Sequence, residues 1–239
     1  MPNSGQKIFA ALDTTDVEEA RNLALRLKGS VGGVKLGLEF FSANGAAGVR
    51  EIAKTGLPIF LDLKFHDIPN TVAGAVRAVM GLRPKILNVH AAGGPAMMRA
   101  AVEAAREAAD AQNIRPPLVI AVTVLTSLDD DDLTAVGQTP PAADQVIRLA
   151  RLTQDCGLDG IVCSPRETAS VRAACGPDFK LIVPGIRPNL SVANDQKRTS
   201  SPSDAINAGA DYLVIGRPIT KAPDPAAAAR AMAAALTES

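Results

Sequence analysis

The chain has 239 residues, of which 47% are hydrophobic and 21% charged, with 25 basic and 25 acidic side chains. This length can bury a large core, and we expect residues 1–239 to form a single domain. The even charge balance, without any Lys/Arg-rich run, argues against nucleic-acid binding, and no apolar run reaches the roughly 18 residues that a membrane span needs.

Eight short apolar runs recur along the chain at intervals close to 30 residues. They predict strands at residues 7–13, 33–38, 58–64, 86–91, 118–125, 160–164, 180–185 and 212–217. Between them, apolar residues follow helical spacing. Capping residues at 13–16 precede a predicted helix at 17–27, those at 200–202 precede one at 203–208, and the Ala-rich segment 225–236 reads as the last helix.

Glycines mark the helix ends before several strands, at Gly56, Gly157, Gly176 and Gly209. Eight strands alternating with about eight helices indicate parallel βα units. At this length an eightfold (β/α)8 TIM barrel is the first expectation, and an open doubly wound sheet is the alternative.

The segment 58–71 combines an apolar strand with the charges Asp62, Lys64 and Asp67. A charged group without a partner is costly inside a core, so three of them at one strand end require a reason. Strand alternation predicts that Asp62 and Lys64 share a face, with Asp67 just beyond the strand. A structural ion pair is the plain interpretation, and a catalytic group is the other.

The other predicted strands also end in polar residues. In a βα barrel these carboxyl-terminal ends meet on one rim, where active sites lie. The rim residues are Asp13, Lys35, Asp62, Lys64, Asn88, His90, Thr126, Ser127, Ser164, Arg187 and Arg217. So many polar groups at one rim predict an active site.

The last two strands suggest a phosphate site. Loops after strands seven and eight of barrels commonly bind phosphate through backbone N–H groups. Gly216 leaves room for close approach, and Arg217 offers several donors, with Arg187 and Gln196 in the preceding loop. An ion pair of Arg217 with a helix-terminal acid is the alternative. Without a Walker or Rossmann motif, a small phosphorylated metabolite fits best.

The N-terminus and the cysteines indicate a cytoplasmic protein. Residues 1–7 lack the apolar core of a secretory signal. Cys156, Cys163 and Cys175 have neither CxxC nor metal-ligand spacing, which is typical of free thiols in a reducing compartment.

The two histidines are not expected to be catalytic. His66 is expected to have a structural role, and His90 either packs in the core or supports residues of the active site without contacting the substrate. With only these two histidines, a zinc site is not expected.

Seven segments resemble the orotidine 5′-phosphate decarboxylase family, in particular its short single-function bacterial type. The longest reads Phe-Leu-Asp-Leu-Lys-Phe-His-Asp-Ile-Pro-Asn-Thr at residues 60–71. The others lie at residues 11–13, 34–41, 121–127, 183–188, 195–198 and 209–220. The match runs from about residue 7 to 225 in the order typical of the family.

The resemblance implies decarboxylation of orotidine 5′-monophosphate to uridine 5′-monophosphate (UMP), the last step of de novo pyrimidine synthesis. It implies a homodimer and no metal or organic cofactor. Lys64 would protonate C6 of the pyrimidine, flanked by Asp62 and Lys35. Asp67 and Thr71 would reach into the partner's site.

The resemblance also implies a set of substrate contacts. Asp13 and Lys35 would hold ribose hydroxyls, and Thr126 the pyrimidine edge. Gln196 would bridge phosphate and base. Arg217, the Gly216 backbone and Arg187 would hold the phosphate, and Pro184 would belong to the binding pocket.

Two rival functions fit parts of this pattern. Related barrel enzymes, 3-keto-L-gulonate 6-phosphate decarboxylase and hexulose-phosphate synthase, share the Asp-x-Lys-x-x-Asp spacing but use magnesium and an acidic ligand on strand two. This chain has Lys35 there, which would repel a cation. A non-catalytic barrel that binds a phosphorylated ligand is the more distant alternative, and it does not require the full set of rim charges.

Overall fold

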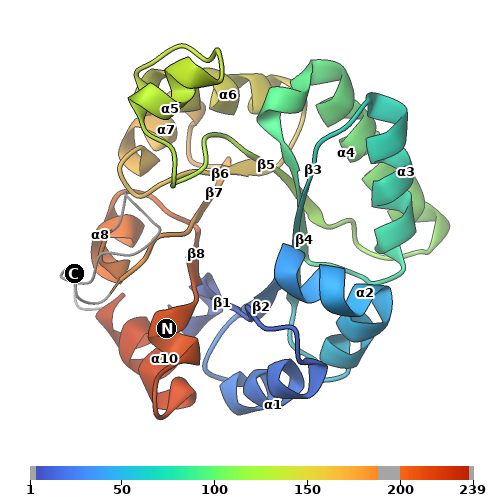
Figure 1. The fold of residues 1–239 in the computed structure, drawn as a ribbon, viewed down its shortest axis with the longest axis vertical. Helices are drawn as coiled ribbons and strands as arrows, with labels where there is room; N and C mark the ends of the chain where they lie inside the picture. The colour runs from blue at the N-terminus through green and yellow to red at the C-terminus, as the bar shows by residue number, and fades with distance from the viewer. Residues whose placement is uncertain (1–3, 188–199, 237–239) are drawn as a thin grey trace.

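The strands form a closed parallel barrel in sequential order, with β8 pairing back to β1 (Figure 1). The structure, a computed structural model, describes residues 4–187 and 200–236. The strands are β1 (Ile8–Ala11), β2 (Gly33–Leu36), β3 (Ile59–Phe65), β4 (Ile86–His90), β5 (Leu118–Val122), β6 (Gly160–Val162), β7 (Lys180–Val183) and β8 (Tyr212–Ile215).

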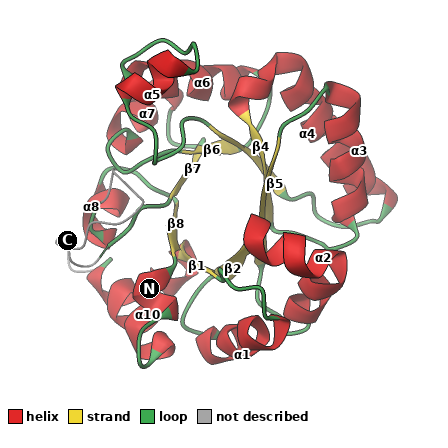
Figure 2. Cartoon of the chain, viewed as in Figure 1, coloured by secondary structure: helices red, strands yellow, loops and turns green. Residues whose placement is uncertain are grey.

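The helices surround the barrel as an outer layer (Figure 2). They are α1 (Val17–Leu27), α2 (Leu38–Ala53), α3 (Pro69–Met80), α4 (Gly94–Ala111), α5 (Asp130–Ala135), α6 (Ala142–Asp155), α7 (Thr168–Cys175), α8 (Pro202–Asn207), α9 (Arg217–Thr220) and α10 (Pro225–Ala235), with 3-10 turns η1 (Ser4–Lys7) and η2 (Ala91–Gly93). No helix in the described part of the chain is long and apolar enough to span a bilayer.

Alternating side chains divide the core into two layers. Ile8 and Ala10 of β1 face the helices, whereas Phe9 and Ala11 face the barrel axis. The inner layer consists of Phe9, Ala11, Phe60, Ile86, Ile120, Ile182 and Val214. Phe9 meets Phe60 and Tyr212 edge to face, with ring centroids 6.3 and 5.5 Å apart. This apolar layer fills the barrel interior, and the polar rim residues lie beyond it at the carboxyl-terminal ends of the strands.

Closure of the sheet confirms the predicted TIM barrel and excludes the open doubly wound alternative. All eight predicted strands are present, and the helices predicted at 17–27, 203–208 and 225–236 correspond to α1, α8 and α10. Gly56, Gly157, Gly176 and Gly209 each follow a helix with positive φ.

Three details of the prediction are wrong. Most strands end two or three residues earlier than predicted, because rim residues such as Asp13 and Ser164 belong to the βα loops. Arg217 does not end β8 but begins α9. The described residues contain ten α-helices rather than about eight, the short α5 and α9 being the additional ones.

Candidate active site

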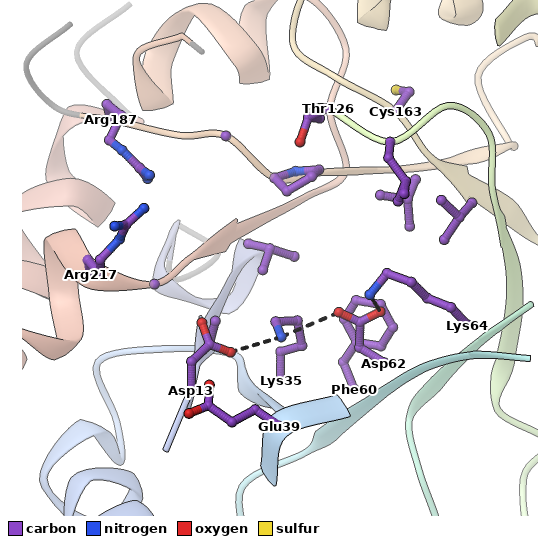
Figure 3. Close-up of a pocket in the computed structure, with 18 of the residues that line it drawn as sticks. Asp13, Lys35, Glu39, Phe60, Asp62, Lys64, Thr126, Cys163, Arg187 and Arg217 are labelled. Atoms are coloured by element: carbon purple, nitrogen blue, oxygen red, sulfur yellow. Dashed lines mark hydrogen bonds and ion pairs between the residues drawn. The ribbon is translucent and has the colours of Figure 1, made fainter. Parts of the chain in front are cut away.

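A pocket of about 480 Å³ opens at the carboxyl-terminal rim of the barrel (Figure 3). Ala11, Phe60 and Val214 of the inner core layer form its apolar lining. Nine of the twelve predicted site residues also line it: Asp13, Lys35, Asp62, Lys64, Thr126, Pro184, Arg187, Gly216 and Arg217. The volume lies in the range typical of small-molecule sites.

Four of these residues form a chain of alternating charges. The Lys64 Nζ lies 2.7 Å from Oδ1 of Asp62, and the Lys35 Nζ lies 3.3 Å from Oδ2 of the same carboxylate. Lys35 also lies 3.3 Å from Oδ1 of Asp13. The side chains of Asp62 and Lys35 are only 11% and 12% exposed, so these pairs are screened far less than surface ion pairs.

The array keeps its inner members ionised despite burial. Burial by itself would lower the pKa of Lys35, but the carboxylates of Asp62 and Asp13 raise it above its ordinary value. Burial would raise the pKa of Asp62, but Lys35 and Lys64 hold it below its ordinary value. A dense set of charges is therefore fixed in a half-enclosed pocket.

The backbone of β3 is irregular where the array begins. Leu61 pairs with Leu87 and Phe65 with Val89, so that three residues of β3 lie opposite one residue of β4. Lys64 has φ = 51°, a left-handed conformation that is uncommon outside glycine. Asp62 and Lys64 line the same pocket, as the sequence predicts. The regular strand alternation on which that prediction rests is, however, interrupted at Lys64.

The arginine side of the pocket faces the array. In Figure 3, the side chains of Arg187 and Arg217 approach each other across the cavity from Lys64. Gly216 precedes Arg217 as the N-cap of α9. Among the described residues, a Cβ at Gly216 would meet only Ala11 and Asp13, each at an ordinary 3.6 Å, so packing within this part of the chain does not demand glycine there.

Three predicted site residues do not line this pocket. Asp67 and Thr71 lie in the exposed stretch 66–71, and Oδ1 of Asp67 accepts a hydrogen bond of 2.6 Å from the N–H of Ile68. Gln196 lies outside the described residues.

Several pocket residues were not predicted from the sequence. Phe60, Val162 and Val214 read as ordinary core residues, because nothing in an apolar strand distinguishes a pocket floor from a barrel plug. Glu39 and Cys163 also line the pocket. Glu39 was identifiable in principle, as an acid directly after a predicted strand end.

The two histidines lie together behind the array. Their ring centroids are 5.3 Å apart. Burial, followed by the proximity of His66 and Lys64, lowers the pKa of His90 to about 4. His90 is therefore neutral at pH 7, and its ring packs against that of His66.

Fold and site together define a (β/α)8-barrel enzyme whose pocket joins a lysine–aspartate array to a pair of arginines. The model of the orotidine 5'-phosphate decarboxylase / HUMPS family matches residues 6–232. The chain belongs to this family.

Individual relatives agree with this assignment. A protein of Rhodospirillum rubrum named orotidine 5'-phosphate decarboxylase is 62% identical over 227 residues, which cover 95% of this chain and 92% of the relative. One of Paramagnetospirillum magneticum with the same name is 57% identical, covering 96% and 97%. The crystal structure of orotidine 5'-phosphate decarboxylase from Lactobacillus acidophilus is similar with a TM-score of 0.86 and 35% identity, covering 96% and 98%.

Proposed function

We propose that this chain is a carboxy-lyase that converts orotidine 5′-monophosphate to UMP and CO2, the last step of de novo UMP biosynthesis, without a metal or organic cofactor. The observation that carries the proposal is one pocket in which the Lys35–Asp62–Lys64 array faces Arg187 and Arg217. Identity of 62% with a relative named for this activity supports the same substrate.

The chemistry explains why a lysine is needed. When the bond between C6 and the carboxylate carbon breaks, its electron pair stays on C6 as a carbanion in the ring plane, where no ring carbonyl can delocalise it. Without an electron-sink cofactor, the protein must stabilise this charge electrostatically. The Lys64 ammonium donates a proton to C6 as CO2 leaves, and Lys64 regains a proton from solvent.

One lysine does not account for the whole rate. An ammonium about 4 Å from the carbanion contributes roughly 4 kcal/mol at an effective dielectric of about 20, or some three decades in rate. Further stabilisation comes from a preorganised array and from phosphate-binding energy that holds the ring against it. Asp62 fixes the Lys64 ammonium through a 2.7 Å contact.

The other pocket residues bind the nucleotide. Lys35 and Asp13 hold ribose hydroxyls, Thr126 contacts the pyrimidine edge, and Pro184 forms part of the wall. Gln196 bridges phosphate and base. Each assignment follows the family resemblance, and all of these residues except Gln196 line the described pocket.

The phosphate binds at the arginine side of the pocket. Arg217 and Arg187 supply guanidinium donors, and the Gly216 backbone approaches the phosphate without a Cβ in the way. Guanidinium groups match phosphate geometry better than ammonium groups do, which favours this end of the cavity for the phosphate.

The active unit is a homodimer in which Asp67 and Thr71 complete the partner's site. Both lie outside the pocket of their own chain, in the exposed stretch 66–71, where the large apolar side chain of Ile68 is 66% exposed. Burial of this stretch against a partner would cover that side chain and bring a second aspartate toward Lys64.

A magnesium-dependent reaction of a related barrel enzyme is the nearest competing function. Lys35 argues against it, because its ammonium lies between the carboxylates of Asp13 and Asp62 and would repel a divalent cation there.

We further propose that residues 1–239 act as one catalytic domain in the cytoplasm. One closed barrel and three buried free cysteines support this.

The decisive experiment follows the loss of orotidine 5′-monophosphate absorbance in the presence of a chelator. We expect full turnover with chelator, and in Lys64→Ala a fall of at least about three decades with the fold retained. Near-normal activity of Lys64→Ala contradicts the assignment of the proton donor. Chelator-sensitive turnover contradicts the cofactor-free reaction, and nucleotide binding without turnover would favour the binding-protein alternative.

A further inference from the structure

Asn88 of β4 makes two hydrogen bonds to the catalytic segment of β3. Its Nδ2 donates to Oδ1 of Asp62 at 2.7 Å, and its Oδ1 accepts from the backbone N–H of Lys64 at 2.8 Å. The side chain is fully buried, and Asn88 is not among the residues that line the pocket. Asn88 therefore contacts Asp62 and Lys64 from the protein interior and not from the pocket.

The two bonds lie where β3 and β4 lose their regular pairing. Between the Leu61–Leu87 and Phe65–Val89 pairs, β3 has three residues and β4 has only Asn88. Extra residues in one strand interrupt the ladder and leave backbone groups without a partner there. The amide of Asn88 replaces the missing partner of Lys64, the residue with φ = 51°.

The same amide also fixes the carboxylate of the array. Oδ1 of Asp62 accepts from Lys64 Nζ and from Asn88 Nδ2, both at 2.7 Å, while Oδ2 pairs with Lys35. The two lysine ammonium groups lie at the ends of flexible side chains, whereas the Asn88 side chain is short and extends from a buried strand. One side chain thus couples the orientation of Asp62 to the backbone of Lys64.

We propose that Asn88 is a positioning residue for the decarboxylation, which holds the Asp62 carboxylate and the left-handed Lys64 backbone so that the Lys64 ammonium points at the reacting carbon. The inference deepens the proposed function and rests on it. Because Asn88 does not reach the pocket, its loss should reduce the rate of the chemical step and leave nucleotide affinity nearly intact.

The test compares Asn88→Ala with wild type and with Thr153→Val. Thr153 is a matched control: it is equally buried, and its hydroxyl donates at 2.7 Å to the carbonyl of Leu149 within α6, away from the pocket. For Asn88→Ala we expect kcat to fall roughly 10- to 100-fold, as for a buried charge that loses a donor. The Kd of UMP from calorimetry should change less than about threefold, and Thr153→Val should keep its kcat.

Asn88→Ser, which retains a polar group, replaces Asn88→Ala if the latter does not fold. A fall in kcat of less than about tenfold in the folded variant overturns the proposal, as does an equal loss of UMP affinity. Failure of both variants to fold also overturns it, since Asn88 would then be a structural residue. Wild-type turnover is measured first, because its absence refutes the proposed function and not the role of Asn88.

Discussion

At the residue scale, the site depends on Asp62, whose two oxygens serve different partners. Oδ1 faces Lys64 and Asn88, and Oδ2 faces Lys35. Removal of any one partner would leave a buried carboxylate with a lone pair unsatisfied, which is costly. The array therefore behaves as a unit, and effects of single substitutions within it should not add.

Arg217 lies outside this unit and allows a separable prediction. We expect Arg217→Ala to weaken UMP binding roughly 10- to 100-fold, because a charge-assisted phosphate contact is lost. Binding of uridine, which has no phosphate, should stay unchanged. Calorimetry with both ligands measures the difference, and added phosphite should restore part of the lost turnover.

Arg21 provides the control for this measurement. It is a half-exposed arginine that pairs with Glu18 at 3.3 Å within α1. Arg21→Ala should bind UMP as the wild type does. If Arg217→Ala also retains full UMP affinity, the phosphate does not bind at this end of the pocket.

The charged site residues could be identified from the sequence, whereas Asn88 was recognisable only as one polar residue of the predicted rim and not by its role. A lysine and two aspartates at the end of an apolar strand conflict with burial, so they stand out without any structure. An uncharged asparagine at a strand end does not conflict with burial in this way, so it does not stand out in the sequence. Its importance depends on the register between β3 and β4, which is set by tertiary pairing and not by the composition of either strand.

At the scale of elements, the two ends of the barrel are stabilised differently. The pocket lies at the carboxyl-terminal ends of the strands, whereas Arg172 of α7 stabilises the opposite end of the barrel. Its Nη1 donates to the carbonyls of Gly176 and Phe179 at 2.6 and 2.7 Å, and its Nη2 contacts Asp211 at 2.6 Å. Phe179 precedes β7 and Asp211 precedes β8, so one guanidinium ties a helix to two strands.

Arg172→Ala should therefore destabilise the fold without affecting catalysis. We expect the free energy of unfolding to fall by about 2–4 kcal/mol, because several partly buried acceptors lose their donor. The corresponding decrease in Tm is roughly 5–15 °C for a domain of this size. Thermal denaturation and kcat at 25 °C measure the two effects separately.

Lys180→Ala is the matched control. Lys180 contacts the same carboxylate of Asp211, but at 3.4 Å and with a side chain 35% exposed. Its loss should cost less than about 1 kcal/mol. Equal stability of the two variants would show that the Arg172 contacts contribute no more than a surface ion pair.

The elements themselves were largely predictable, and their ends were not. Apolar runs and the glycines after helices specify eight βα units, because both reflect local backbone preferences. The predicted strand ends lie too late, as at Asp13 and Arg217, since a polar residue that follows an apolar run is compatible with a strand or a loop. Closure of the sheet decides between them.

At the scale of the whole molecule, one chain does not bring all the predicted site residues together. Lys35, Asp62 and Lys64 line the pocket, while Asp67 lies in the exposed stretch 66–71. No property of a single strand or helix indicates that a residue serves a second chain. The family resemblance alone suggested it, and a test must therefore act on the assembly.

Hybrid dimers provide that test. Lys64→Ala and Asp67→Ala chains should each be inactive alone. In a hybrid, one site lacks both groups and the other lacks neither, so equal mixing should restore about one quarter of the wild-type sites. Turnover is measured after mixing chains with different affinity tags, and purification through both tags should yield hybrids with about half of the wild-type activity per dimer.

A second mixture separates sharing between chains from other causes of recovery. Asp62 and Lys64 belong to the same pocket of one chain, with their side chains 2.7 Å apart. A hybrid of Asp62→Ala and Lys64→Ala therefore has a defect in each site and should stay inactive. Recovery in both mixtures would point to exchange or contamination of chains. Recovery in neither, with the hybrids verified by their tags, would mean that each site is built from one chain and that Asp67 acts within its own.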